Sequence, residues 1–147
     1  MAIRLADADA TEQFGRLLAA ALRVGDVVAL FGALGAGKTT LCRGVLRGLG
    51  HLGDVASPTF AIVQPYAPPD TRVPVWHVDL YRIEHARELE ELGLDEARAE
   101  AAMLIEWSER LPALWPDALR LTFAVEGAAR ALTAVVPPAW GERWPLR

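Results

Sequence analysis

The strongest structural signal in the chain is the stretch Val27-Val-Ala-Leu-Phe-Gly-Ala-Leu-Gly-Ala-Gly-Lys-Thr-Thr40. It begins with a short apolar run that predicts a buried strand, and it continues through a glycine-rich segment over 32–37. The residues over 38–49 then predict a helix that Gly50 closes. From Gly32 to Thr39 the stretch matches the pattern G-x-x-x-x-G-K-S/T at every fixed position. Strand, loop and helix in this order predict a phosphate-binding loop in an α/β domain.

Each fixed residue type in this pattern has a chemical task. Glycine tolerates backbone conformations that turn several N–H groups toward one anion, and the start of the helix adds its positive dipole end. Lys38 is expected to reach the β- and γ-phosphates, and Thr39 to offer its hydroxyl to Mg²⁺. The predicted nucleotide-binding residues of the loop are Gly35, Ala36, Gly37, Lys38, Thr39 and Thr40.

The composition is that of one globular domain without a membrane span. The chain has 147 residues, of which 52% are hydrophobic and 23% are charged, a balance that supports one core. No apolar run reaches the ~18 residues of a membrane-spanning helix, and the first residues lack the apolar centre of a signal peptide. Since Cys42 is the single cysteine, we expect a reducing compartment, the cytoplasm.

Charge and rare residue types narrow the function. The formal net charge is −4, whereas a chain that grips nucleic acid by itself usually has a basic surface. RNA is therefore expected to be involved only through a partner. Lys38 is the one lysine among 15 basic residues, and it lies in the glycine-rich loop. The chain has no asparagine, which disfavours the asparagine-lysine motif that reads guanine in switch GTPases and favours ATP.

The rest of the chain predicts further strands and helices. We expect an α/β fold: a P-loop NTPase-like three-layer domain over 1–136, with a mixed, mostly parallel central sheet, and an irregular tail over 137–147. Helices are expected over 9–23, capped by Asp9 or Thr11, and over 84–92 and 95–99. Strands are expected over 59–66, 73–80, 101–106, 119–125 and 131–136. Pro65 indicates that the strand over 59–66 ends there or lies at a sheet edge.

Two carboxylates are candidates for the acid that a P-loop enzyme needs near its metal. Asp79 and Glu106 each end an apolar strand, where such an acid usually lies. A carboxylate in that position is also often just the first solvated residue, so the pattern alone leaves both interpretations open.

The residues around these acids also have two interpretations. Thr59 enters a strand as a common β-former, or it supplies a switch-like hydroxyl near the γ-phosphate and metal. By themselves, His77 and Tyr81 indicate packing residues, and Arg82 a surface ion-pair partner. Three tryptophans favour core or interface positions, or a partner contact in the case of the last two: Trp107, Trp140 and Trp144.

Together these pieces resemble the bacterial TsaE (YjeE) family of small ATPases. The likeness runs from about residue 10 to about residue 135, and its matching stretches share the family's order and spacing. They are Leu34-Gly-Ala-Gly-Lys-Thr-Thr40, Ser57-Pro-Thr-Phe60, His77-Val-Asp-Leu-Tyr-Arg82, Glu91-Leu-Gly-Leu-Asp-Glu96 and Ile105-Glu-Trp107. The phosphate loop alone is shared by very many proteins, whereas the combination is specific. Ala33 departs from the pattern, because an acidic residue is common there.

The resemblance implies a role for each matched residue. Thr39 and Glu106 would hold Mg²⁺, Glu106 through water, and Glu106 would also orient the attacking water. Thr59 and Asp79 would belong to two switch-like segments, while Tyr81 and Arg82 would support the second or meet a partner. Thr11 and Arg130 would approach the nucleotide. The implied catalytic set is Lys38, Glu106, Asp79 and Thr59.

The resemblance also implies a pathway. Members of this family work with the TsaD and TsaB proteins, which transfer a threonylcarbamoyl group to adenosine 37 of tRNA. The chain would thus bind and hydrolyse MgATP, slowly alone and faster with its partners, and would meet tRNA only indirectly. Three alternatives remain: a small-molecule kinase, a nucleotide-gated binding module without useful hydrolysis, and, more weakly, a GTPase.

Overall fold

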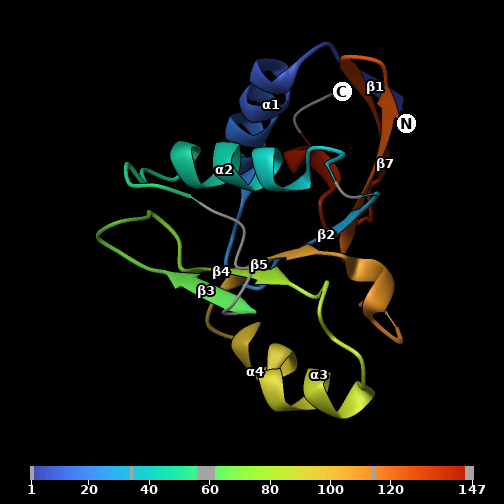
Figure 1. Ribbon diagram of the computed structural model, residues 1–147. Helices are drawn as coiled ribbons and strands as arrows, with labels where there is room; N and C mark the ends of the chain where they lie inside the picture. The colour runs from blue at the N-terminus through green and yellow to red at the C-terminus, as the bar shows by residue number, and fades with distance from the viewer. Residues whose placement is uncertain (1, 34, 56–61, 114, 145–147) are drawn as a thin grey trace.

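The computed structural model describes residues 2–33, 35–55, 62–113 and 115–144 (Figure 1). Over these residues, seven strands form one sheet in the order β1-β7-β6-β2-β5-β4-β3. The strands are β1 (Ala2–Leu5), β2 (Val27–Phe31), β3 (Val63–Tyr66), β4 (Val75–Asp79), β5 (Ala102–Glu106), β6 (Leu119–Glu126) and β7 (Ala129–Val135). The helices are α1 (Ala8–Ala21), α2 (Lys38–Gly48), α3 (Ala86–Leu92) and α4 (Leu94–Ala97), with short 3₁₀ turns η1 (Ser108–Arg110) and η2 (Gly141–Arg143).

The sheet is mixed, as predicted, and its parallel part is central. Strand β2 is parallel to both of its neighbours, β6 and β5, and β5 is parallel to β4. The outer pairs β1–β7, β7–β6 and β4–β3 are antiparallel. Parallel pairs therefore make up three of the six, fewer than the predicted majority. The consecutive strands β3–β4 and β6–β7 pair antiparallel, and the N-terminal strand β1 adds a third antiparallel pair.

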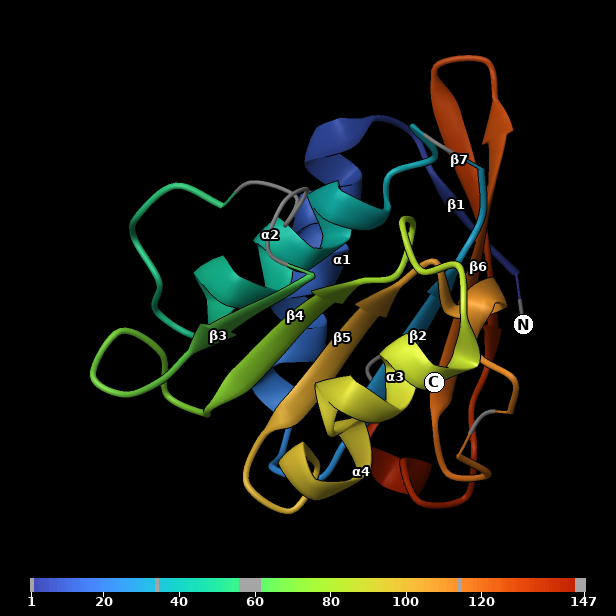
Figure 2. The same cartoon turned by 60° about the horizontal axis from the view of Figure 1, so that its bottom comes forward.

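Helices cover both faces of the sheet, which gives the predicted three layers. Helices α1 and α2 lie on one face, and α3 and α4 lie on the other (Figures 1 and 2). The central strands are buried on both faces, because their side chains alternate between two apolar clusters. In β5, for example, Leu104 joins the cluster under α1 and α2, while Met103 and Ile105 join the other.

Two glycines let α1 and α2 pack closely. A Cβ atom on Gly44 would lie 2.1 Å from the backbone oxygen of Glu12, and one on Gly15 would lie 2.4 Å from that of Leu41. No side chain fits at such distances, so the approach of the two helices depends on these glycines. The contact matters for the site because α2 begins at Lys38, at the end of the glycine-rich loop.

The start of α1 differs from the prediction. The cap is Asp7 rather than Asp9 or Thr11: its Oδ1 accepts a hydrogen bond of 2.8 Å from the backbone N–H of Ala10. An N-cap carboxylate receives this bond when it lies three residues before its donor, and Asp9 instead lies in the first helical turn. Strand β1 was not predicted at all, since of its four residues only Leu5 is buried.

The edge strand β3 covers part of the strand predicted over 59–66. Strand β3 begins at Val63, and residues 59–61, where the predicted strand starts, lie outside the described part of the chain. Pro65 lies in this edge strand, as its chemistry predicts.

In the tail, Trp140 and Trp144 are buried, and the Trp144 ring meets that of Phe14 edge to face at 5.9 Å. These tryptophans therefore pack on the domain.

The tail contributes to stability in a way that a mutation can measure. Trp140 is 1% exposed, and its Nε1 has no hydrogen-bond partner among the described residues. We expect Trp140→Ala to lower the free energy of unfolding by about 3–5 kcal/mol, because it leaves a large cavity. Trp140→Phe should cost less, since it keeps a ring and removes the unpartnered N–H.

Urea unfolding measures both changes. The control is Leu52→Ala, because Leu52 is 90% exposed; its effect should stay within about 0.5 kcal/mol. Wild-type stability in Trp140→Ala would show that the tail does not pack in this way.

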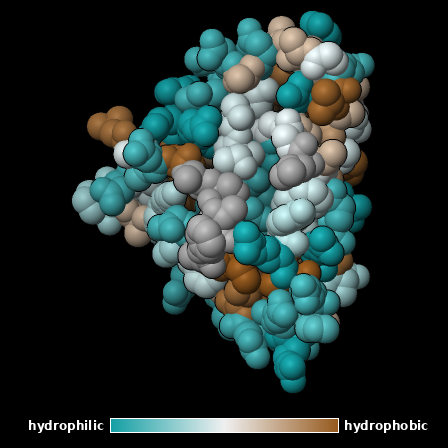
Figure 3. Space-filling view, in the orientation of Figure 1, coloured by the Kyte–Doolittle hydropathy of each residue, from teal (hydrophilic) through white to brown (hydrophobic). Residues whose placement is uncertain are grey.

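The surface of the protein is mainly hydrophilic on the face seen in Figure 3, and hydrophobic side chains occur there in small groups. Within the described ranges, none of the helices combines the length and the apolar character needed to cross a bilayer.

Candidate functional site

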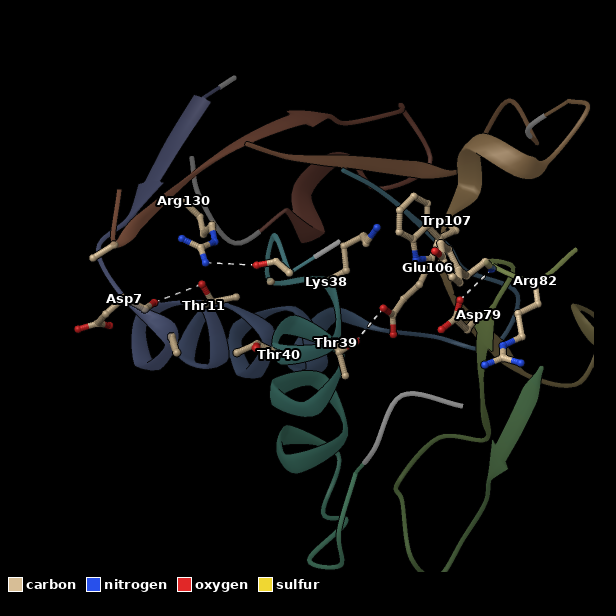
Figure 4. Close-up of a pocket in the computed structure, with 15 residues that line it drawn as sticks. Asp7, Thr11, Lys38, Thr39, Thr40, Asp79, Arg82, Glu106, Trp107 and Arg130 are labelled. Carbon is tan, nitrogen blue, oxygen red and sulfur yellow. Dashed lines mark hydrogen bonds between the residues drawn. The ribbon is translucent and has the colours of Figure 1, made fainter. Parts of the chain in front are cut away.

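A cavity of about 470 Å³ lies at the carboxyl ends of the central strands, where α/β sheets commonly bind ligands. It is formed by the end of the glycine-rich loop, the start of α2, the ends of β4 and β5, and residues from α1 and β7 (Figure 4). Its lining includes most of the residues predicted from the sequence: Thr11, Gly35, Gly37, Lys38, Thr39, Thr40, Asp79, Tyr81, Arg82, Glu106, Trp107 and Arg130. Two predicted residues are missing from it. Ala36 is buried beneath the loop, and Thr59 lies outside the described residues.

The glycine-rich loop has the backbone that its sequence predicts. Gly35 and Gly37 have φ angles of +78° and +109°, a region that side chains disfavour. Gly37 is the N-cap of α2 and has no side chain to satisfy the free N–H groups of the helix. The first turn of α2 therefore presents unsatisfied donors and the positive end of its dipole at the cavity.

Lys38 is held inside the site. Its Nζ donates a hydrogen bond to the backbone oxygen of Gly32 and lies 3.5 Å from the centroid of the Trp107 ring. Burial lowers the pKa of Lys38, and the carboxylates of Glu109, Glu106 and Asp79 oppose that shift. The ammonium group of Lys38 therefore lies beside the loop and close to three carboxylates.

Glu106 links the loop to the sheet. It is 3% exposed at the end of β5, and its Oε1 accepts a 2.8 Å hydrogen bond from the Thr39 hydroxyl. Asp79 lies opposite Glu106 in the parallel pairing of β4 and β5 and is 8% exposed. Its Oδ1 accepts a 2.9 Å bond from the backbone N–H of Tyr81. Neither acid is therefore a merely solvated strand end.

Thr11 and Arg130 approach the loop from the other side. Arg130 Nη2 donates to the backbone oxygen of Gly35 at 3.2 Å, and the Thr11 hydroxyl donates to that of Asp7 at 3.3 Å. Because β7 and the β4–β5 pair lie on opposite sides of β2, the cavity has Arg130 at one end and the two acids at the other (Figure 4).

Three residues take roles that their sequence context did not indicate. His77, expected only to pack, has its Nε2 2.6 Å from Glu106 Oε2. Tyr81, also expected to pack, is 47% exposed, and its ring lies 4.9 Å from that of Trp107 at the cavity. Glu109 accepts a 2.9 Å hydrogen bond from the backbone N–H of Gly32 through Oε2. No motif marks Glu109, and the bond spans 77 positions, so local patterns could not reveal it.

The donor set suits a magnesium nucleotide. Hydroxyl and carboxylate oxygens, which Thr39 and Glu106 offer, are the ligands that Mg²⁺ prefers. Lys38, Arg130 and the start of α2 supply positive charge and N–H groups that suit phosphate. The cavity volume lies within the range of small-molecule sites, ~300–1,000 Å³.

Comparisons with known proteins show which family this chain belongs to. The family model described as "Threonylcarbamoyl adenosine biosynthesis protein TsaE" matches residues 5–132. A protein of Streptomyces coelicolor named tRNA threonylcarbamoyladenosine biosynthesis protein TsaE is 43% identical over 90% of this chain and 92% of its own. A Bacillus subtilis protein of that name is 36% identical over 97% of this chain and 88% of its own. The crystal structure of Bacillus subtilis YdiB superposes with a TM-score of 0.80 at 29% identity, over 97% of this chain and 90% of the other. The chain belongs to the TsaE family of threonylcarbamoyl adenosine biosynthesis proteins.

Proposed function

We propose that this protein binds MgATP in the cavity and hydrolyses it, in support of threonylcarbamoyladenosine formation at position 37 of tRNA. The observation that carries the proposal is the hydrogen bond between Thr39 and Glu106. It joins the residue that P-loop proteins use for Mg²⁺ to a buried acid on a neighbouring strand, and P-loop NTPases hold their metal with a hydroxyl and an acid of this kind. Membership of the TsaE family supports the pathway.

Different residues of the chain would bind the phosphates, hold Mg²⁺ and orient the attacking water. The backbone N–H groups of 35–40 hold the phosphates, and Lys38 leaves Gly32 and Trp107 to meet the β- and γ-phosphates. Thr39 offers its hydroxyl oxygen to Mg²⁺, which, when bound, neutralises charge that develops on the phosphates. Glu106 orients the attacking water and accepts its hydrogen bond, and Asp79 faces the same region from β4. Thr59 remains part of the proposal as a switch-like residue.

Arg130 is proposed to contact the nucleotide from the far end of the cavity. Replacing it by methionine removes the charge and keeps most of the apolar stem. We expect KM for ATP to rise about tenfold, the order of one lost charged hydrogen bond, with a smaller change in kcat. The matched control is Arg120→Met on the neighbouring strand, because Arg120 is exposed and is absent from the cavity lining. An unchanged KM in Arg130→Met would remove Arg130 from the site.

Partners complete the proposal. We propose that TsaD and TsaB, working in the cytoplasm, stimulate a hydrolysis that is slow in the isolated chain. An arginine supplied by a partner can raise such rates by about 10³–10⁵. The formal net charge of −4 suits a protein that meets tRNA only through a complex.

Reconstituted tRNA modification tests the proposed function. TsaD, TsaB, tRNA and a threonylcarbamoyl donor are mixed with this protein and ATP, and threonylcarbamoyladenosine is counted per tRNA over many turnovers. We expect sustained modification with the wild-type chain and little with Lys38→Ala. Modification that proceeds equally well without this protein would overturn the proposal. A γ-phosphate found on a small-molecule acceptor instead would support a kinase.

A further inference from the structure

His77 is the one side chain that holds the second oxygen of Glu106 among the described residues. Its ring is 0% exposed, and its Nε2 lies 2.6 Å from Glu106 Oε2. The other carboxylate oxygen, Oε1, accepts from the Thr39 hydroxyl at 2.8 Å. Strands β4 and β5 bring these groups together, because His77 lies two residues before Asp79, the register partner of Glu106. Both oxygens of the carboxylate are therefore fixed.

The direction of the bond between His77 and Glu106 follows from the charge of the carboxylate. An ionised carboxylate only accepts hydrogen bonds, so beside an ionised Glu106 the ring donates from Nε2. Nδ1 is buried and has no partner among the described residues, which leaves Glu106 as the group that orients the imidazole. Cys42 also lies within 4.8 Å, but burial raises the pKa of its thiol, and a neutral thiol is a weak competitor for this bond.

The two bonds on Glu106 differ in what they depend on. Thr39 belongs to the phosphate loop, and its hydroxyl is the group proposed to meet Mg²⁺. Its bond to Glu106 can therefore change when the nucleotide and Mg²⁺ bind or leave. His77 lies on β4, between β5 and the edge strand β3, and outside the cavity lining, so its bond does not depend on nucleotide contacts. A carboxylate that orients water needs such an independent anchor, because small misplacements reduce rates strongly.

We propose that His77 is a positioning residue: it donates from Nε2 to Glu106 and keeps that carboxylate in the orientation that hydrolysis requires. The inference rests on the proposed role of Glu106. A purely structural histidine would affect folding stability and leave the rate per folded molecule unchanged. A positioning histidine affects kcat, and another side chain that donates from the same place restores the rate.

Two nearly isosteric variants separate these roles. His77→Gln retains an N–H donor near the position of Nε2, and His77→Met has similar size and no donor. With the full chain, TsaD, TsaB and tRNA, we expect His77→Met to lower kcat by about 10- to 100-fold, the usual effect of losing an outer partner of a metal-site carboxylate. KM for ATP should change by about threefold at most, because the substitution leaves the contacts that bind ATP in the ground state unchanged. His77→Gln should recover most of kcat.

Melting temperature and a packing control complete the comparison. The Gln variant buries an amide, so it should be no more stable than the Met variant, and a higher rate in it cannot come from stability. Cys42→Ala, which alters packing beside the ring, should keep kcat within about twofold of wild type, because the bond to Glu106 survives. A folded His77→Met chain with wild-type kcat would overturn the inference. So would a folded His77→Gln chain as slow as the Met variant.

A spectroscopic measurement decides the case if a variant fails to fold. Imidazole ¹⁵N spectra of the wild-type chain should show one of its three histidines with a slowly exchanging hydrogen on Nε2. That resonance should move in Glu106→Gln. A buried histidine protonated on Nδ1 alone would refute the inference. If the wild type hydrolyses no ATP with its partners, the proposed function fails, while the spectrum still decides whether His77 donates to Glu106.

Discussion

Lys38→Ala should lower ATP hydrolysis by about 100- to 1,000-fold, the loss typical of removing one preorganised electrostatic group. ATP binding should weaken as well, because Lys38 is the cation nearest the start of α2 in a cavity that already contains two buried acids, Asp79 and Glu106. Without the ammonium group these acids would repel the γ-phosphate. Phosphate release and calorimetric titration with ATP measure the two effects separately.

A second substitution at Lys38 separates the effect of losing the positive charge from the effect of losing the side-chain volume. Lys38→Met keeps most of the apolar stem and removes the ammonium group that lies over the Trp107 ring, so it should hydrolyse ATP as poorly as Lys38→Ala while remaining better folded. Lys38→Arg should also fail, because a planar guanidinium replaces a compact charge. Full hydrolysis in Lys38→Ala would refute the phosphate-loop assignment.

Glu106→Gln should reduce hydrolysis by about 10²–10⁴, the range that general base catalysis contributes, and should change ATP affinity far less. Glutamine keeps the size of the side chain and an acceptor for Thr39, but it loses the charge that would hold the water. Single-turnover hydrolysis and equilibrium ATP binding separate the two effects. Glu126→Gln is the control, since that carboxylate is exposed at the end of β6.

The same variant separates an ATPase from a nucleotide-gated module. If hydrolysis drives or resets the partner complex, Glu106→Gln should lose sustained tRNA modification together with hydrolysis. If ATP binding alone did the work, Glu106→Gln would modify tRNA normally and Lys38→Ala would not. That second pattern would contradict the proposed use of Glu106.

The local part of the fold could be predicted from the sequence because its signals are local. An apolar run, a glycine-rich segment and a helix pattern that starts at Lys38 predict β2, the loop and α2, and the structure has β2 and α2 at the predicted places. The mixed sheet and the edge position of Pro65 followed from residue chemistry as well. By contrast, β1 is short and mostly exposed, so it has no apolar alternation to detect, and pairing with β7 alone defines it.

The site shows the same division between local and distant contacts. The loop could be recognised from its pattern, and the two acids stood out as candidates because each follows a buried strand. The structure brings both acids and most of the loop residues into one cavity. The contact of His77 with Glu106 spans 29 positions, and that of Glu109 with Gly32 spans 77. Each depends on which strands become neighbours, which residue patterns do not specify. A buried histidine between apolar residues therefore suggests packing until the sheet order is known.

ATP hydrolysis by the purified chain, measured alone and with TsaD, TsaB and tRNA, tests whether this protein is an ATPase that its partners stimulate. We expect slow hydrolysis alone, marked stimulation by the complex, and loss of both activities in Lys38→Ala. Hydrolysis that the complete complex leaves unchanged would contradict the proposed role in tRNA modification, and an absence of hydrolysis under every condition would contradict the ATPase itself.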